Sequence, residues 1–150
     1  MTALLDSKPN SHVQRQPPTA RRPQMLCVDD DPDFHATIEV RMRKYDVDIE
    51  HAYFGTEGIV KATRTLPDVV VMDQAMPRGN GEYFLETIKR NPKTSGIPVI
   101  VLTGMRNPTL KQHLLQAGAE AFLQKPVLFD ELVHHLGRII DLRERKNNRG

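Results

Sequence analysis

The sequence predicts an α/β fold in which helices cover both faces of one five-stranded parallel sheet. Five short apolar runs alternate with five segments of helical periodicity along the chain, and this regular alternation is typical of parallel sheets. The run at residues 69–72 holds four apolar residues, three of them β-branched, as expected for a buried strand. The length of 150 residues fits one domain of ordinary size.

The first unit begins with a strand at residues 25–28, which three consecutive aspartates follow. Asp31 is suited to cap the next helix, and Pro32 is suited to its first turn. The spacing of apolar residues predicts one buried helix face. That face carries Phe34, Ile38 and Met42.

The second strand is predicted at residues 47–52, where polar and apolar residues alternate. A short helix follows and ends before Pro67. Its inward-facing residues are expected to be Ile59, Val60 and Thr63. The third strand covers residues 69–73 and ends on Asp73, directly before a loop rich in proline and glycine.

The third helix stops at residues 91–92, and the fourth strand covers residues 98–102, directly before Thr103. Asn107 and the proline after it repeat the cap-plus-proline start for a fourth helix. Gly118 closes that helix. The apolar faces of these two helices carry Phe84, Leu85, Ile88, Leu110, Leu114 and Ala117.

The fifth strand is predicted at residues 121–123, shortly before Lys125 and Pro126. The last helix is lined by Leu128, Leu132, Leu136 and Ile139. We therefore expect a folded domain over residues 25–142. Residues 1–24, with four prolines among polar residues, are predicted to form a disordered extension, and residues 143–150 a polar tail.

Charge is divided unevenly between the extension and the domain. Of 21 basic and 19 acidic residues, four basic and one acidic lie in residues 1–24, which leaves 17 basic and 18 acidic residues. The remainder therefore carries a net charge of −1, and we expect no direct DNA binding.

The chain shows no targeting or membrane signal. No apolar run approaches the ~18 residues of a membrane span, and residues 1–24 lack the apolar core of a signal peptide. A cytoplasmic location is the default expectation. The single cysteine, Cys27, excludes an internal disulfide and agrees with a reducing compartment. We expect Cys27 to be buried and unreactive.

Five polar residues follow predicted strands and are expected to converge, because right-handed crossovers place the carboxyl ends of all strands at one edge. They are Asp29, Asp30, Asp73, Thr103 and Lys125. By its position alone, Asp73 is a metal ligand, a nucleophile or a helix cap. Three close carboxylates repel one another unless a cation joins them, and Mg²⁺ is the natural partner of such a site.

The same residues suit a phosphoryl group. A lysine and a threonine hydroxyl can bind phosphoryl oxygens, and an aspartate can attack phosphorus. The chain contains no G-x-x-x-x-G-K-[ST] loop, so it is not a nucleotide switch of that class. The six histidines show no ligand spacing for zinc, and we expect His35 to be a surface helix residue.

These residues resemble the receiver domain of two-component response regulators, a (βα)5 flavodoxin-like fold. The resemblance covers about residues 23–143. It rests on five motifs in order: Val28-Asp29-Asp30-Asp31-Pro32, Asp73-x-x-Met76-Pro77-x-x-x-Gly81, Thr103-Gly104, Phe122 three residues before the lysine, and Lys125-Pro126. A weaker match is His51-Ala52-x-x-Gly55-x-Glu57-Gly58.

The resemblance implies that Asp73 is the phosphoacceptor of a Mg²⁺-dependent site. Asp30 would bind Mg²⁺ directly and Asp29 mainly through water, and the backbone carbonyl of Ala75 would complete the protein ligands. Asp31 is then a helix cap rather than a ligand.

The resemblance also implies a switch. Lys125 would pair with a phosphoryl oxygen, Thr103 would shift toward the phosphoryl group, and Phe122 would turn inward behind it. The Lys125–Pro126 peptide bond would be cis. Phe122 lacks the hydroxyl of the commoner tyrosine, and Ala75 and Met105 stand where polar residues are frequent.

The implied function is a phosphorylation-dependent interaction module. A histidine kinase or histidine phosphotransfer domain would donate the phosphoryl group. The switched surface would comprise the fourth helix, fifth strand and fifth helix, and would bind a downstream protein or a second copy of the chain.

Three alternatives remain at this point. One is a Mg²⁺-dependent phosphohydrolase, which commonly needs a second acid two residues after the nucleophile, where this chain has Ala75. A second is a degenerate receiver that signals without phosphate, which the intact set of residues disfavours. The third is a receiver cut from a longer regulator with a separate output domain, rather than a stand-alone receiver, although Met1 favours a natural start.

Overall fold

The computed structural model describes residues 21–146. In this range the strands are β1 (Gln24–Val28), β2 (Asp48–Ala52), β3 (Val69–Asp73), β4 (Val99–Thr103) and β5 (Ala121–Gln124). The helices are α2 (Pro32–Met42), α3 (Gly55–Thr65), α4 (Gly81–Arg90), α5 (Pro108–Gln116) and α6 (Phe129–Ile139). All ten predicted elements are present, with ends shifted by a few residues at most.

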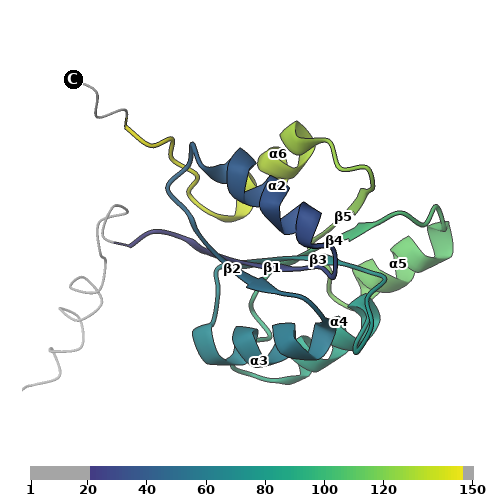
Figure 1. The fold of residues 1–150 in the computed structure, drawn as a ribbon. Helices are drawn as coiled ribbons and strands as arrows, with labels where there is room; N and C mark the ends of the chain where they lie inside the picture. Colours follow the sequence, from purple (N-terminus) through teal and green to yellow (C-terminus); the bar gives the residue numbers. More distant parts are fainter. Residues whose placement is uncertain (1–20, 147–150) are drawn as a thin grey trace, which may run out of the picture.

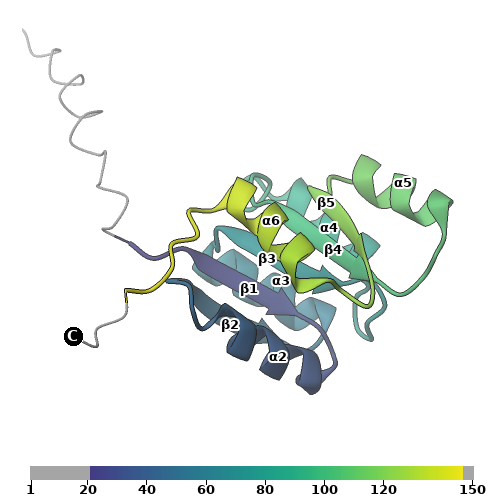
Figure 2. The same ribbon diagram turned by 90° about the horizontal axis from the view of Figure 1, so that it is seen from above.

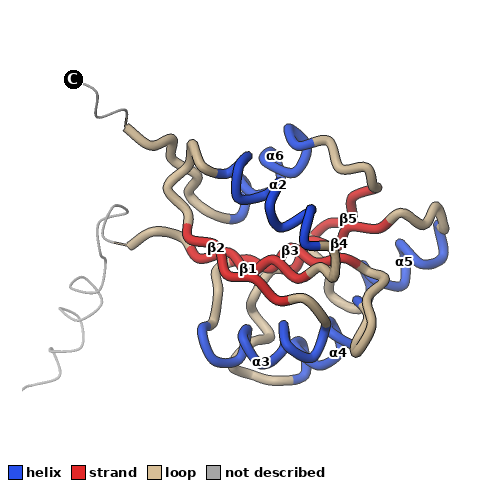
Figure 3. Tube along the Cα trace, in the orientation of Figure 1, coloured by secondary structure: helices blue, strands red, loops and turns tan. Residues whose placement is uncertain are grey.

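The molecule has three layers (Figures 1 and 3). The five strands form one parallel sheet in the order β2-β1-β3-β4-β5. Helices α2 and α6 cover one face, and α3, α4 and α5 cover the other (Figure 1). The predicted α/β class and parallel sheet are confirmed.

The core is divided by the sheet, because alternate residues of each strand point to opposite faces. In β1, Leu26 and Val28 belong to the cluster under α3 and α4, whereas Met25 and Cys27 belong to the cluster under α2 and α6. Strands β3 and β4 are buried at every position, as the apolar run at residues 69–72 predicted.

Side chains cap three of the helices that begin at the carboxyl edge, namely α2, α4 and α5. Asp31 accepts a hydrogen bond from the backbone N–H of Asp33, and Asn107 accepts from those of Thr109 and Leu110. Both caps were predicted, and each precedes a proline in the first turn. The caps fix the loops that directly follow β1 and β4.

Two predicted core positions are wrong. Leu128, expected to line the last helix, directly precedes α6 and is 69% exposed. Val60, expected to face inward from α3, is 58% exposed. The buried residues of this helix are instead Gly55, Gly58 and Ala62. The sheet approaches α3 so closely that glycine and alanine, rather than a branched side chain, occupy the contact.

The described ends of the chain pack onto the domain. Arg21, assigned to the extension from sequence, pairs with Asp68 through two bonds of 2.8 and 3.0 Å. The backbone N–H of Gln24 also donates to Asp68, at 2.7 Å. The prediction of a disordered extension otherwise concerns residues 1–20, which lie outside the described residues.

The beginning of the predicted polar tail also contacts the domain. Glu144 forms an isolated antiparallel bridge with Tyr45, and the backbone N–H of Arg145 donates to the carbonyl of Lys44 at 2.7 Å. Both described ends lie at the amino edge of the sheet (Figures 1 and 2). The carboxyl edge, where the candidate site lies, is therefore clear of them.

Within residues 21–146, no helix has the length and apolar character needed to cross a membrane.

Candidate functional site

Three aspartates meet at the carboxyl edge, as predicted. Asp73 ends β3, and Asp29 and Asp30 follow β1 directly. One carboxylate oxygen from each lies within 4.8 Å of the others. Asp29 is fully buried and Asp73 is 8% exposed, whereas Asp30 is exposed. The site is thus a cluster of three carboxylates, of which Asp30 is open to solvent.

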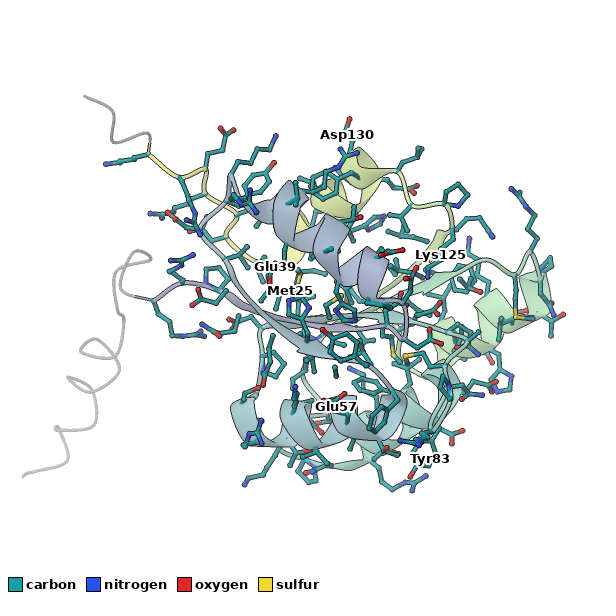
Figure 4. The ribbon with its side chains drawn as sticks, in the orientation of Figure 1. Met25, Glu39, Glu57, Tyr83, Lys125 and Asp130 are labelled. Carbon is teal, nitrogen blue, oxygen red and sulfur yellow. The ribbon has the colours of Figure 1, made fainter. Side chains whose placement is uncertain are left out.

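Lys125 contacts this acidic cluster from the loop after β5. Its Nζ lies 3.1 Å from Asp29 Oδ2 and 3.4 Å from Asp73 Oδ1, and 5.2 Å from the centre of the Phe34 ring. Figure 4 shows Lys125 beside the start of α2. The Lys125–Pro126 bond is cis, as predicted.

The acidic residues and the lysine perturb one another. Burial raises the pKa of Asp73, and the nearby carboxylate of Asp29 acts in the same direction, while Lys125 opposes them. Burial disfavours the charge of Lys125, but Asp29 and Asp73 outweigh it and raise its pKa. Asp73 is therefore a carboxylate whose negative charge is only partly balanced by the described residues.

Thr103 ends β4, the strand next to that of Asp73, and is 1% exposed. Its Oγ1 accepts from the backbone N–H of Met105 at 3.0 Å. Its carbonyl accepts from the backbone N–H of Lys125 at 2.7 Å and from the side chain of Gln124 at 3.1 Å. Thr103 thus joins the loops after β4 and β5.

Phe122 lies in β5 and packs, partly buried, against the core cluster under α3 and α4. Its register partner in β4 is Val101, two residues before Thr103. Phe122 therefore points to the face of the sheet that α3 and α4 cover, and its role in a switch stays a prediction.

Gln74 is a buried residue for which we predicted no role from the sequence. It directly follows Asp73 and is 5% exposed, yet its Oε1 has no hydrogen-bond partner among the described residues. The missing side chain of Gly81 makes room for this amide. Gln74, Ala75 and Met105 line one side of an open hollow next to the acidic site.

The structure corrects the prediction that His35 is a surface residue. His35 is 3% exposed, and its Nε2 lies 2.7 Å from the backbone carbonyl of Asp29. It shares a helix face with Ile38 and Met42, the other buried residues of α2. The helical spacing of residues 35, 38 and 42 indicates this face, but Phe34 gives an equally regular and more apolar pattern with Ile38 and Met42.

We expected no zinc-ligand set, because the histidines show no ligand spacing in the sequence. The fold nevertheless brings one cysteine and two histidines together. Cys27, His35 and His51 each place one potential ligand atom within 4.8 Å of the other two. The sequence does not indicate this group, because its three residues come from three different elements, β1, α2 and β2. Cys27 is fully buried, as expected, and burial raises the pKa of its thiol.

A fold of five β/α units with acids and a lysine at the carboxyl edge defines a class of signalling domain. The family model of the response regulator receiver domain matches residues 25–137. The chain belongs to this family.

Curated relatives agree. Protein PilH of Pseudomonas aeruginosa is 31% identical over 117 residues, which are 78% of this chain and 97% of PilH. Hybrid signal transduction histidine kinase D of Dictyostelium discoideum is 30% identical over 133 residues, 89% of this chain but 8% of that kinase. The chain spans less than half the length of several other relatives, among them the transcriptional regulator RpaA of Synechocystis, of which it covers 46%.

Solved structures agree as well. Chemotaxis protein CheY4 of Vibrio cholerae superimposes with a TM-score of 0.74 at 26% identity, covering 80% of this chain and all of that one. The receiver domain of a sensor histidine kinase of Pseudomonas aeruginosa gives a TM-score of 0.72 at 26% identity over 79% of this chain and 98% of that one. That structure has a magnesium ion in its active-site cleft.

The chain is therefore a receiver domain of two-component signalling, a phosphorylation-dependent module with the flavodoxin-like fold. Receiver domains generally act as signalling modules rather than as enzymes, and the phosphohydrolase alternative is not favoured.

Proposed function

We propose that Asp73 accepts a phosphoryl group from the phosphohistidine of a histidine kinase or phosphotransfer domain. A carboxylate oxygen of Asp73 attacks phosphorus, the bond from phosphorus to the imidazole nitrogen breaks, and the imidazole leaves. The observation that supports this most is the contact between Lys125 and Asp73 at the carboxyl edge of the sheet, with 3.4 Å between Nζ and Oδ1.

Residues of the chain provide two functions in this step. Lys125 offers a point charge to the transferred phosphoryl oxygens and keeps its contact with Asp29, at 3.1 Å. Thr103 supplies a hydroxyl donor, once its Oγ1 turns from the N–H of Met105. Burial of Asp73 and Thr103 limits access by water.

The cluster of three carboxylates fits Mg²⁺, because it offers carboxylate oxygens close together and contains no nitrogen or sulfur donor among the three residues. Asp29, Asp30, Asp73 and the backbone carbonyl of Ala75 would hold the ion. When bound, Mg²⁺ supplies positive charge that offsets the phosphoryl oxygens. Asp30→Asn is expected to weaken Mg²⁺ binding in calorimetry.

The output surface is proposed to be α5, β5 and α6. Thr103 is tied to Lys125 through backbone and to Met105 through its hydroxyl, so a shift of Thr103 moves the loops that lead into α5 and α6. Leu115 and Leu128, on this side, are 41% and 69% exposed. Such apolar side chains suit a downstream protein or a second copy of the chain.

The proposal also covers the boundaries of the domain and the location of the protein. We propose that residues 25–142 form the receiver unit, with the preceding segment and residues 143–150 outside it. We also propose a cytoplasmic location, which the single cysteine supports, since disulfide-poor chains are typical of reducing compartments.

The test is to incubate the full chain with a small phosphodonor and Mg²⁺ and to measure its intact mass. The parent should gain one phosphoryl group, and Asp73→Asn should gain none. Asp68→Asn is the matched control, because Asp68 lies at the opposite end of β3 and should leave labelling unchanged. Full labelling of Asp73→Asn would overturn the assignment.

A further inference from the structure

A second group of potential ligands lies under α2, apart from the carboxylates. Cys27 in β1 and His51 in β2 are register partners on neighbouring parallel strands, so their side chains point to the same face of the sheet. Helix α2 covers this face and contributes His35. A thiol sulfur and two ring nitrogens thereby come within 4.8 Å of one another.

The two imidazoles are oriented by oxygen atoms on their outer sides. His35 Nε2 lies 2.7 Å from the carbonyl oxygen of Asp29, and His51 Nε2 lies 2.6 Å from Glu39 Oε2. Figure 4 shows Glu39 extending from α2 toward the sheet. Both Nδ1 atoms consequently face each other, 2.6 Å apart.

We propose that Cys27, His35 and His51 form a binding site for a thiophilic transition-metal ion such as Zn²⁺. Thiolate and imidazole are the donors that zinc prefers. Imidazoles that bind metals characteristically donate their other N–H to a carboxylate or a backbone carbonyl. Both histidines of this site have that arrangement, with Glu39 and with Asp29.

The geometry accommodates an ion after small side-chain rotations. A tetrahedral ion with bonds of about 2.0 Å to nitrogen and about 2.3 Å to sulfur requires the two Nδ1 atoms to move slightly apart. The ion displaces the thiol proton of Cys27 and the proton between the Nδ1 atoms, while both Nε2 protons keep their oxygen acceptors. Three protein ligands leave a fourth position for water.

The ion can enter from the edge of the sheet. Strand β2 is an edge strand, and the His51 side chain is 21% exposed. Tyr53, 43% exposed, lies over His35 with 4.3 Å between ring centres. Because Cys27 and His35 are buried, the ion would be held between sheet and helix with only its His51 side open.

Cobalt distinguishes this site from the carboxylates. We would titrate Co²⁺ into the full chain with Mg²⁺ in excess, under reducing conditions, and record the absorption spectrum. A thiolate bound to Co²⁺ gives a near-ultraviolet charge-transfer band that carboxylate ligands do not give. Since Cys27 is the single cysteine of the chain, the band can arise only there. One equivalent of Zn²⁺ should then remove it.

Variants assign the ligands. Cys27→Ala should abolish the band, and His51→Gln should weaken metal binding at least about ten-fold. His113→Gln is the matched control, because His113 is an exposed histidine next to Glu82, and it should leave binding unchanged. Circular dichroism and urea unfolding report whether each variant is folded.

Absence of the band in the folded parent would overturn the proposal and would leave the two histidines as a hydrogen-bonded pair. The same conclusion would follow if folded His51→Gln bound Co²⁺ as tightly as the parent. Neither result would bear on phosphorylation of Asp73.

Discussion

Asp73 is a buried carboxylate whose negative charge the protein disfavours. Burial, followed by the neighbouring carboxylates, raises its pKa against the opposing effect of Lys125. A carboxyl group with a raised folded-state pKa stabilises the fold fully below its unfolded pKa, and this contribution is lost as the pH rises through the folded pKa. Ionised Asp73 therefore lowers the free energy of unfolding at neutral pH.

Replacing Asp73 should stabilise the metal-free protein at neutral pH. Asp73→Asn removes the disfavoured charge, and we expect the free energy of unfolding to rise by about 1 kcal/mol at pH 7. The gain should shrink as the pH falls below the raised pKa, where Asp73 itself is protonated. Urea unfolding with EDTA present measures both. Asp130→Asn, an exposed carboxylate, should bring no gain, and a less stable Asp73→Asn protein would contradict this reading.

The lifetime of an acyl phosphate at Asp73 should depend on Ala75 and Met105. Both line the hollow next to the site, and neither side chain can orient an attacking water by a hydrogen bond. We therefore expect slow autodephosphorylation. Introducing Ala75→Asn together with Met105→Glu should accelerate it, as followed by intact mass after removal of the phosphodonor. Equal decay of the two phosphorylated proteins would show that water orientation does not set the rate.

At the scale of elements, the β3–α4 loop is held in place by the start of α3. The backbone N–H of Thr56 donates to the carbonyl of Arg78 at 2.8 Å, and Gly55 lies directly against the backbone of Gly79. Gly79 has a φ of +105°, which favours glycine. This contact positions the loop that carries Ala75 after the phosphoacceptor strand.

Gly55→Ala should destabilise the protein strongly, by about 1–3 kcal/mol. A β-carbon at position 55 would collide with backbone atoms of Gly79, which cannot move aside as a side chain would. Gly137→Ala is the matched control. It also lies in a helix, its β-carbon would meet no atom within 4 Å, and it should be neutral or stabilising. The free energies of unfolding of both variants are measured in urea. Equal values would show that the close contact between Gly55 and Gly79 does not limit the size of residue 55.

The sequence predicted the elements well and their contact faces less well. Apolar runs and caps predicted all ten elements, because strand burial and capping depend on nearby residues. The convergence of Asp29, Asp73 and Lys125 followed from parallel topology alone. Topology does not predict the burial of His35 or the outward position of Val60, because both depend on how closely a helix approaches the sheet. The proximity of Cys27 and His51 depends on the register of β1 and β2. Amino-acid composition does not predict this register.

At the scale of the whole molecule, the folded part should not bind DNA sequence-specifically. Residues 25–150 carry 17 basic and 18 acidic groups, and every helix among residues 21–146 belongs to the receiver fold. Such a balance provides little attraction to phosphates. Electrophoretic mobility shifts on random and genomic fragments should show no specific complex. A salt-resistant footprint on one defined sequence would contradict this expectation.

Asp73 is the proposed phosphoacceptor, and its phosphorylation is the step on which every other proposed role of this site depends. The most direct measurement is to phosphorylate the full chain, reduce it with borohydride, which converts an aspartyl phosphate to homoserine, and sequence its peptides by mass spectrometry. We predict homoserine at position 73 and nowhere else, and none when the phosphodonor is omitted. Homoserine at another aspartate, or a phosphoryl group retained on a histidine or serine with position 73 unmodified, would contradict the account.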